Sequence, residues 1–423
     1  MSWMLILPIM FALMLLNMRI YLAMFSAIII YFIFFSNVPM AIAVQRLVAP
    51  TQNSSLLAIP FFILLGTLLS HTGIAERILR LAGLLVGKMR GGLAMANVMM
   101  STLMGGVSAS NLADAAMLAR MMVPEMERAG YNRAFAAAVT GCGSLVTPII
   151  PPGIALIIYG MVADVSIGRM FMAGIFPGLL CAFLLMLTIW LIALRRGYQP
   201  ALKTWPKPKE YGSALIHAWP AVFVLVGVIG GIRANIFTPT EAGAAAVLLV
   251  TFIGFVVYRE MKVSHVTSAL ADTARSTASI MLVIMASSAL AWIFSLEHAG
   301  VAMAEWITGL TSNKYLFLTL LNLLLLVVGM FIEGTALIIV LVPLLKPVVM
   351  QLGIDPVHFG LVMILNLSIG TLTPPVGTVM LLVCNITNVK LNDFLKQGLP
   401  LLLALLVALA LVTYIPAISL ALT

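Results

Sequence analysis

A short polar stretch interrupts one of the most apolar parts of the chain. Residues 368–377 read SIGTLTPPVG and are flanked on both sides by hydrophobic residues. A proline inside a helix removes a backbone donor and leaves a carbonyl without its partner, at a cost of about 3 kcal/mol. In lipid that carbonyl needs a replacement partner. The stretch therefore predicts a break in a membrane helix whose bare carbonyl oxygens bind a cation, with a simple kink in a packed helix as the alternative.

The same pattern occurs earlier in the chain. Residues 148–153 read PIIPPG, and 223 residues separate Pro151 from Pro374. The same interval separates further matching pairs, namely Pro124 and Pro347, Gly130 and Gly353, Pro152 and Pro375, Phe171 and Phe394, and Pro177 and Pro400. Upstream, HTGIA at 71–75 resembles HAGVA at 298–302, an interval of 227 residues. These matches predict an internal repeat from about 71 to 180 and again from about 298 to 403.

Composition places these motifs in a membrane. The chain has 423 residues, of which 62% are hydrophobic and 9% charged, whereas soluble proteins carry roughly 25% charged residues. The formal charge of +9 comes from basic residues in short loops, as in multi-pass membrane proteins, and indicates no nucleic-acid partner. The apolar segments are 3–17, 20–36, 55–70, 92–104, 134–163, 170–194, 214–232, 240–258, 277–295, 314–332, 356–386 and 398–420. The three cysteines and five histidines form no metal-binding pattern, so we expect no cofactor.

Loop charge sets the expected orientation. The connection 195–212 carries five basic residues and one glutamate, which predicts a cytoplasmic loop. Counting spans outward from it, the broken helices 134–163 and 356–386 cross the membrane in opposite directions, as in an inverted repeat. Residues 73–92 form an amphipathic pattern, with Ile74, Ile78, Leu81 and Leu85 on one face, which predicts a helix lying along the membrane surface.

A second polar interruption precedes each broken helix. Residues 105–116 predict a re-entrant hairpin with its tip at Ser108–Asn111, and residues 331–339 form its counterpart, with Glu333 opposite Ser110. Paired interruptions in an inverted repeat indicate a transporter's binding site, here two cation sites with substrate between them. Asp114 is interpreted either as a helix-capping carboxylate or as a functional acid. Glu333 either contacts a cation directly, acts through a neighbouring ligand, or stays neutral.

One further acid has a structural interpretation. Thr238, Pro239 and Glu241 have the spacing of a helix capping box, so we expect Glu241 to stabilise a helix N-terminus.

Several stretches resemble the large membrane subunit of tripartite ATP-independent periplasmic (TRAP) transporters, and the likeness covers nearly the whole chain. They are LLAIPFFILLGTLLSHTGIAERI at 56–78, KMRGGLAMANV at 88–98, SASNLADAAMLARMMVPEM at 108–126, PIIPPGIALIIYG at 148–160, TPTEAGAAAV at 238–247 and GIDPVHFGLVMILNLSIGTLTPPVG at 353–377. The resemblance implies an all-α, elevator-type, sodium-driven importer of an organic acid in the bacterial inner membrane. It also implies two partners, which are a small four-helix membrane subunit as a separate chain and a periplasmic substrate-binding protein.

The resemblance also implies site residues. The first sodium site would use Ser108, Ser110, Gly143, Val146, Thr147 and Pro148, and the second would use Glu333, Gly334, Thr335, Gly370, Thr373 and Pro374. Asn111 and Asp114 would contact the substrate. The chain departs from the usual family pattern at Ala109, Thr147 and Glu333, so the motifs leave the choice among C4-dicarboxylates, sialic acid, and keto or sugar acids open.

Four regions follow from this reading. Residues 1–70 are N-terminal scaffold helices, 71–194 the first repeat, 195–295 the cytoplasmic loop with further scaffold helices, and 296–423 the second repeat. A stand-alone sodium–carboxylate symporter of related architecture is the main alternative. An intramembrane enzyme would need a nucleophile–base pair or a metal cluster, which the sequence does not show, and a passive channel would not need duplicated cation sites.

Overall fold

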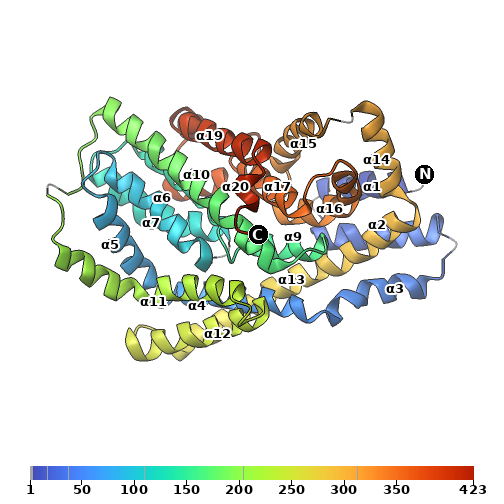
Figure 1. The fold of residues 1–423 in the computed structure, drawn as a ribbon, viewed down its shortest axis with the longest axis horizontal. Helices are drawn as coiled ribbons and strands as arrows, with labels where there is room; N and C mark the ends of the chain where they lie inside the picture. Colours follow the sequence, from blue (N-terminus) through green and yellow to red (C-terminus); the bar gives the residue numbers. More distant parts are fainter. Residues whose placement is uncertain (1–2, 17, 37, 109, 203, 312) are drawn as a thin grey trace.

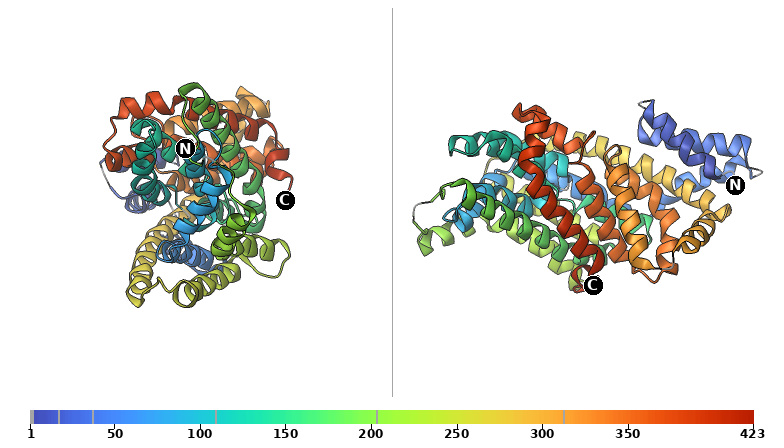
Figure 2. Two further views of the ribbon diagram at one scale, coloured as in Figure 1. Left: turned by 90° about the vertical axis from the view of Figure 1, so that its left-hand side faces the viewer. Right: turned by 90° about the horizontal axis from the view of Figure 1, so that it is seen from above.

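The computed structural model describes residues 3–16, 18–36, 38–108, 110–202, 204–311 and 313–423. Over these residues the fold is helical, and its only β feature is an isolated bridge between Arg90 and Pro200. Five of the described helices are long and apolar enough to cross a membrane, or six if the bent pair Met40–Gln52 and Ser54–Leu69 is one span. The molecule is elongated, with the N-terminal helices at one end (Figures 1 and 2).

One group of helices lies outside the repeats. It consists of α1 (Trp3–Leu15), α2 (Ile20–Phe34), α3 (Met40–Val48), α4 (Ala58–Leu69), α11 (Pro208–Arg233), α12 (Pro239–Phe252) and α13 (Val263–Leu296). In Figure 1, α4, α11 and α12 lie together along one long edge, and α13 continues from them toward α2 and α3. The predicted capping box begins α12, because the Thr238 side chain accepts from the Glu241 backbone amide and Glu241 accepts from the Thr238 backbone amide. We call these seven helices the flanking helices.

The remaining helices form two matching series. The first contains α5 (Ile74–Val86), α6 (Gly92–Ser108), α7 (Asn111–Arg128), α8 (Arg133–Ser144), α9 (Ile154–Val162) and α10 (Ile167–Arg196). The second contains α14 (Ala299–Leu310), α15 (Lys314–Gly329), α16 (Gly334–Gln351), α17 (Pro356–Gly370), α18 (Thr378–Thr387) and α19 (Leu391–Tyr414), followed by α20 (Ala417–Leu420). We call α6 with α7 the first hairpin, and α15 with α16 the second hairpin.

Helix boundaries reproduce the interval found in the sequence. Both the first and the last residues of α7 and α16 are 223 positions apart, as are the first residues of α8 and α17. The caps match as well, because Asn132 and Asp355 each accept two backbone amides at the start of their helices. Equivalent glycines, Gly130 and Gly353, have positive φ angles of 89° and 67°, a conformation that favours glycine. The repeat is therefore structural as well as sequential.

Both Pro-Pro motifs interrupt their helices, as the sequence predicts. The first break spans residues 145–153, between α8 and α9, and the second spans 371–377, between α17 and α18. The two Pro–Pro peptide bonds are cis. Residues of the first break are buried throughout, whereas Pro374 and Pro375 in the second are exposed. The two repeats thus place the same motif in different surroundings.

The two series also pack against each other. The Tyr159 hydroxyl of α9 donates to the Pro356 carbonyl at the start of α17, at 2.6 Å. The ring of Tyr159 lies against Gly360, where a Cβ atom would come within 2.4 Å of it. This close approach needs glycine and fixes α9 beside α17.

The predicted amphipathic helix is α5, with one difference. Its Ile74, Ile78 and Leu81 are buried, but Leu85 is 43% exposed. Leu81 packs with Ala214 and Ala218 of α11, and Leu84 is partly buried against the same cluster. α11 therefore covers the side of α5 that carries Leu84 and leaves Leu85 exposed. Helical periodicity alone does not predict which side is covered.

Candidate substrate and cation site

A small cavity of about 50 Å³ lies where the two series meet. Its lining comes from the start of α7, the start of α16 and both breaks. The lining residues are Asn111, Leu112, Pro148, Ala155, Glu333, Gly334, Thr335, Ile338, Ile364, Leu367, Ser368, Thr371 and Thr378. Four segments that are far apart in the sequence therefore converge on one point, as the sequence predicts for the two hairpin tips and the two breaks.

Oxygen-bearing side chains make up part of the cavity lining, alongside apolar ones. The Thr335 hydroxyl donates to the Glu333 carboxylate, and the Ser368 hydroxyl donates to the Ile364 carbonyl at 2.7 Å. The Thr378 hydroxyl is buried and has no hydrogen-bond partner. A space of about 50 Å³ is well below the roughly 300–1,000 Å³ of small-molecule sites. An organic acid can enter only when the lining side chains move.

The first predicted cation site gathers around the first break. Gly143, Val146 and Thr147 are buried. The Gly143 carbonyl accepts from the Val146 amide at 3.1 Å, and the Val146 carbonyl accepts from two following amides, at 3.1 and 3.2 Å. Each carbonyl oxygen has two lone pairs, so these hydrogen bonds leave the Gly143 oxygen able to accept a second interaction. Pro148 lines the central cavity, whereas Gly143, Val146 and Thr147 do not.

Asp114 lies beside this first site rather than in the cavity lining. One of its carboxylate oxygens, Oδ2, accepts from Ser101 at 2.8 Å and from Thr147 at 3.1 Å. The other oxygen, Oδ1, is buried with no partner. Gly143 lies close to Ser101, because a Cβ atom on Gly143 would be 3.5 Å from the Ser101 hydroxyl. Of the two residues assigned to substrate, Asn111 lines the cavity and Asp114 joins the residues assigned to the first cation.

The tip of the first hairpin is only partly described. Ser108 ends α6, and Ser110 precedes α7 in an extended conformation, with its carbonyl accepting from the Asp114 amide at 3.1 Å. Ala109, one of the positions that departs from the family pattern, lies outside the described residues.

The second predicted site lies where the second hairpin meets the second break. Glu333 precedes α16, and Gly334 and Thr335 form its first turn. Gly370 ends α17 against Gly329, where a Cβ atom would come within 2.8 Å of the Gly329 backbone. The Thr373 hydroxyl donates to the Gly370 carbonyl at 2.9 Å. Glu333, Gly334 and Thr335 line the central cavity, whereas Gly370, Thr373 and Pro374 do not, and Pro374 is exposed.

Sequence reasoning missed several polar residues at this centre. Ser368, Thr371 and Thr378 line the cavity, and all three stand in or next to the SIGTLTPPVG stretch, so their hydroxyls were the available signal. Ser101 holds Asp114 from α6. Its signal was weaker, because a single serine in an apolar segment is common in packed membrane helices.

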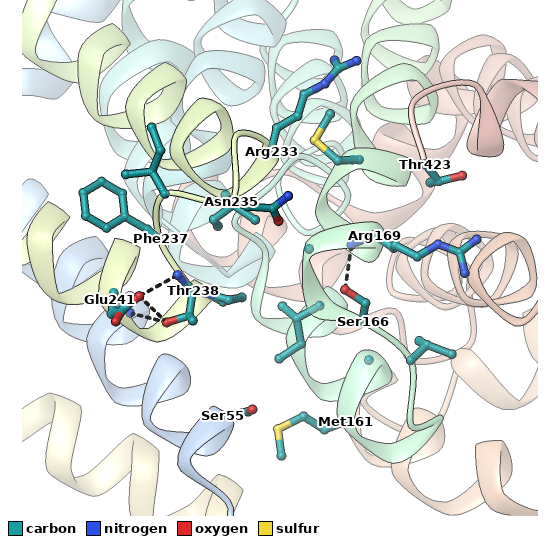
Figure 3. A pocket seen from close by; sticks show the side chains of 18 of the residues that line it. Ser55, Met161, Ser166, Arg169, Arg233, Asn235, Phe237, Thr238, Glu241 and Thr423 are labelled. Atoms are coloured by element: carbon teal, nitrogen blue, oxygen red, sulfur yellow. Dashed lines mark hydrogen bonds between the residues drawn. The ribbon is translucent and has the colours of Figure 1, made fainter.

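A larger cleft of about 650 Å³ lies elsewhere, between the α9–α10 connection and the α11–α12 connection. Its charged groups do not converge. Figure 3 shows the side chains of Arg169 and Arg233 pointing away from each other. Arg169 pairs with Asp355 at 3.4 Å, and Glu241 is engaged in the capping box. The smaller central cavity, which gathers oxygens from both repeats, is therefore the better candidate for substrate and cations.

Comparisons with known proteins agree with this architecture. The family "Tripartite ATP-independent periplasmic transporter, DctM component" matches residues 7–418. The sialic acid TRAP transporter large permease protein SiaM of Vibrio cholerae serotype O1 is 40% identical over 380 residues, covering 89% of this chain and 88% of that protein. The C4-dicarboxylate TRAP transporter large permease protein DctM of Pseudomonas aeruginosa is 36% identical over 377 residues, with coverage of 89% and 88%.

Among solved structures, the Alcanivorax borkumensis YdaH transporter shares the fold. The TM-score is 0.61 at 16% sequence identity, over 88% of this chain and 86% of that one. The family and both relatives are transporter permeases, so the expectation of a membrane transporter rather than an enzyme is confirmed. The chain belongs to the DctM component family of tripartite ATP-independent periplasmic transporters, and it is an integral membrane protein.

Proposed function

We propose that the chain is the large membrane subunit of a sodium-coupled importer of an organic acid. The observation that carries the proposal is the central cavity, in which the two hairpins and the two helix breaks meet. The relatives are named for sialic acid and for C4-dicarboxylates, and both of these substrates carry carboxylates. A carboxylate is therefore the common chemistry that we assign to the substrate.

The cavity suits an anion held between two cations. α7 and α16 begin at its wall with Asn111 and Gly334, and helix N-termini carry partial positive charge that favours carboxylates. Asp114 and Glu333 are the acids next to the two proposed sodium sites, so each sodium ion has a nearby negative charge. The ions would take oxygens from the Gly143 carbonyl on one side and from the Thr373 hydroxyl on the other.

Movement would follow an elevator-like scheme. Residues 71–194 and 296–423 contain the hairpins and the breaks, and they would carry substrate and ions together. Residues 1–70 and 195–295 contain the flanking helices, and they would stay in place in the inner membrane with the small membrane subunit. The periplasmic substrate-binding protein would deliver the acid from outside.

Reconstitution tests the proposal directly. The chain would be placed in proteoliposomes with its small membrane subunit, and the cognate binding protein would be added outside with labelled organic acid. We expect uptake only with an inward sodium gradient and with both partners present. Equal uptake with potassium on both sides would contradict the sodium coupling. Uptake by the chain without a binding protein would instead support a stand-alone symporter.

A further inference from the structure

A second cavity adjoins the candidate site. It has a volume of about 380 Å³ and lies between the start of α16 and the flanking helices α2 and α13. Its lining residues are Met18, Arg19, Ile20, Tyr21, Ile158, Ser279, Ile280, Val283, Glu333, Thr335, Ala336 and Ile339. Glu333 and Thr335 also line the smaller central cavity. Their hydrogen-bonded side chains are therefore shared by the two spaces.

Arg19 is the only Lys, Arg or His among the described residues that line these two cavities. Its guanidinium donates to the Tyr21 hydroxyl at 3.1 Å, and none of the ion pairs among the described residues includes it. A guanidinium has five N–H donors in a planar fork. One bond to Tyr21 leaves donors that a carboxylate can engage in a bidentate pair.

The place of Arg19 along its neighbouring helices brings it to the cavity. α2 has 15 residues, so it is about 22 Å long and shorter than a hydrocarbon core of roughly 30 Å. The Tyr31 hydroxyl, near the end of α2, bonds Glu297 at the end of α13 at 2.7 Å. At the other end of α2, Arg19 shares the cavity with Ser279, which is in the middle of α13. Arg19 is exposed, so its guanidinium is open to an anion that enters the cavity from outside.

We propose that Arg19 binds the carboxylate of the organic acid in this second cavity, where the acid waits before it enters the adjoining central cavity. The identity of the ligand rests on the proposed function. A volume of about 380 Å³ falls within the roughly 300–1,000 Å³ of small-molecule sites, unlike the central cavity. Arg19 directly precedes α2 of the flanking helices, so under the proposed elevator scheme it would be a stationary contact that faces the moving hairpin. Glu333 on the opposite wall repels the carboxylate until a cation neutralises it, which couples acid binding here to sodium.

Kinetics provides the first test. In proteoliposomes at saturating sodium, Arg19→Gln should raise KM for the organic acid about tenfold, which corresponds to roughly 1.4 kcal/mol, while sodium half-saturation stays within about twofold. Arg19→Lys should recover part of the loss, because it keeps the charge but not the fork. Arg46→Gln is the matched control, since Arg46 lies over Trp292 at 5.5 Å and lines neither cavity. An unchanged KM in Arg19→Gln would overturn the proposal.

A labelling experiment tests the site without transport. Ser279→Cys places a thiol on the exposed cavity wall, while the native Cys142, Cys181 and Cys384 are buried. With Arg19 present, an anionic methanethiosulfonate reagent should react about fivefold faster, relative to a cationic one, than in the Arg19→Gln background, because exposed and half-buried charges attract modestly. Adding a C4-dicarboxylate or sialic acid should slow labelling when sodium is present.

The two experiments separate the two claims. The Arg19 site would be refuted if the ratio of anionic to cationic labelling rates does not depend on Arg19, or if no carboxylate slows labelling. Either result would refute it even if uptake is sodium-driven. If the ratio of labelling rates depends on Arg19 but uptake needs no sodium gradient, the Arg19 site would be supported and the coupling of uptake to sodium refuted. The carboxylate protection measured with native Arg19 needs no arginine variant, so it remains decisive if Arg19→Gln fails to fold.

Discussion

The Thr147 hydroxyl donates a 3.1 Å hydrogen bond to Asp114 Oδ2, and this bond ties the first hairpin to the first helix break. The same oxygen accepts from Ser101 of α6 at 2.8 Å. Asp114 thus contacts both helices of its hairpin and the break that follows. Its other oxygen, buried without a partner, is the atom that a nearby cation would satisfy, because buried polar atoms are rarely left unpaired.

Replacing Asp114 by asparagine removes this charge with little change of shape. The asparagine oxygen can still accept from Ser101 and Thr147, so we expect the protein to fold. Uptake should fall by at least about tenfold and sodium half-saturation should rise, because the first cation loses a neighbouring charge and tenfold corresponds to roughly 1.4 kcal/mol. Uptake at varied sodium concentrations, with thermal melting of the purified variant, measures both effects.

The matched control is Asp272→Asn. Asp272 is an exposed residue of α13 that pairs with Arg275 at 3.5 Å, and such surface pairs contribute about 0–1 kcal/mol. This variant should transport normally. Wild-type sodium dependence in a folded Asp114→Asn variant would exclude Asp114 from the first cation site.

Thr373→Val tests the second cation site. The hydroxyl donates to the Gly370 carbonyl at 2.9 Å, and this carbonyl also accepts from the Thr373 amide at 3.1 Å. Loss of the hydrogen bond from the Thr373 hydroxyl should lower the free energy of unfolding by about 0.5–1.5 kcal/mol. Apparent sodium affinity, in contrast, should fall roughly tenfold. Thr188→Val is the control, because Thr188 donates to the Leu184 carbonyl at 2.8 Å within α10, away from both breaks. Equal sodium dependence in the two variants would count against Thr373 as a ligand.

Sodium should stabilise the purified protein against thermal unfolding. A ligand that binds only the folded state at about 100 times its Kd adds roughly 2.7 kcal/mol. Melting curves in sodium, potassium and choline chloride at equal ionic strength distinguish specific binding from a general salt effect. We expect the sodium-specific shift to shrink in Asp114→Asn and in Thr373→Val. A melting temperature that is the same in all three salts would argue against the cation sites.

Gly370→Ala should separate the second hairpin from the second break. The added Cβ atom would lie 2.8–3.0 Å from backbone atoms of Gly329, which cannot rotate away as a side chain can. Overpacking of this kind costs about 1–3 kcal/mol, so the yield of folded protein and the melting temperature should both fall. Gly83→Ala in α5 is the control, because nothing lies within 4 Å of its added Cβ atom. A Gly370→Ala variant as stable as Gly83→Ala would refute the close approach.

The sequence determined the local features of this protein. Single prolines such as Pro177 and Pro400 stay inside their helices, but a Pro-Pro pair followed by glycine interrupts one. Glycine permits positive φ, so the two breaks and the matched turns at Gly130 and Gly353 follow from local residue types. The 223-residue interval predicted the repeat, and the helix boundaries of α7 and α16 reproduce it. The capping box at Thr238 was also predictable, since its chemistry involves residues only three positions apart.

The tertiary structure decided which of these features meet. Periodicity placed Leu85 on the buried face of α5, but the position of α11 leaves it exposed. The two breaks carry equivalent motifs, yet the first is buried and Pro374 in the second is exposed. Asp114 could have faced the substrate or the break. Its contact with Thr147, 33 residues away, arises only when α7 packs on α8, because long-range contacts depend on how helices pack and not on local propensity.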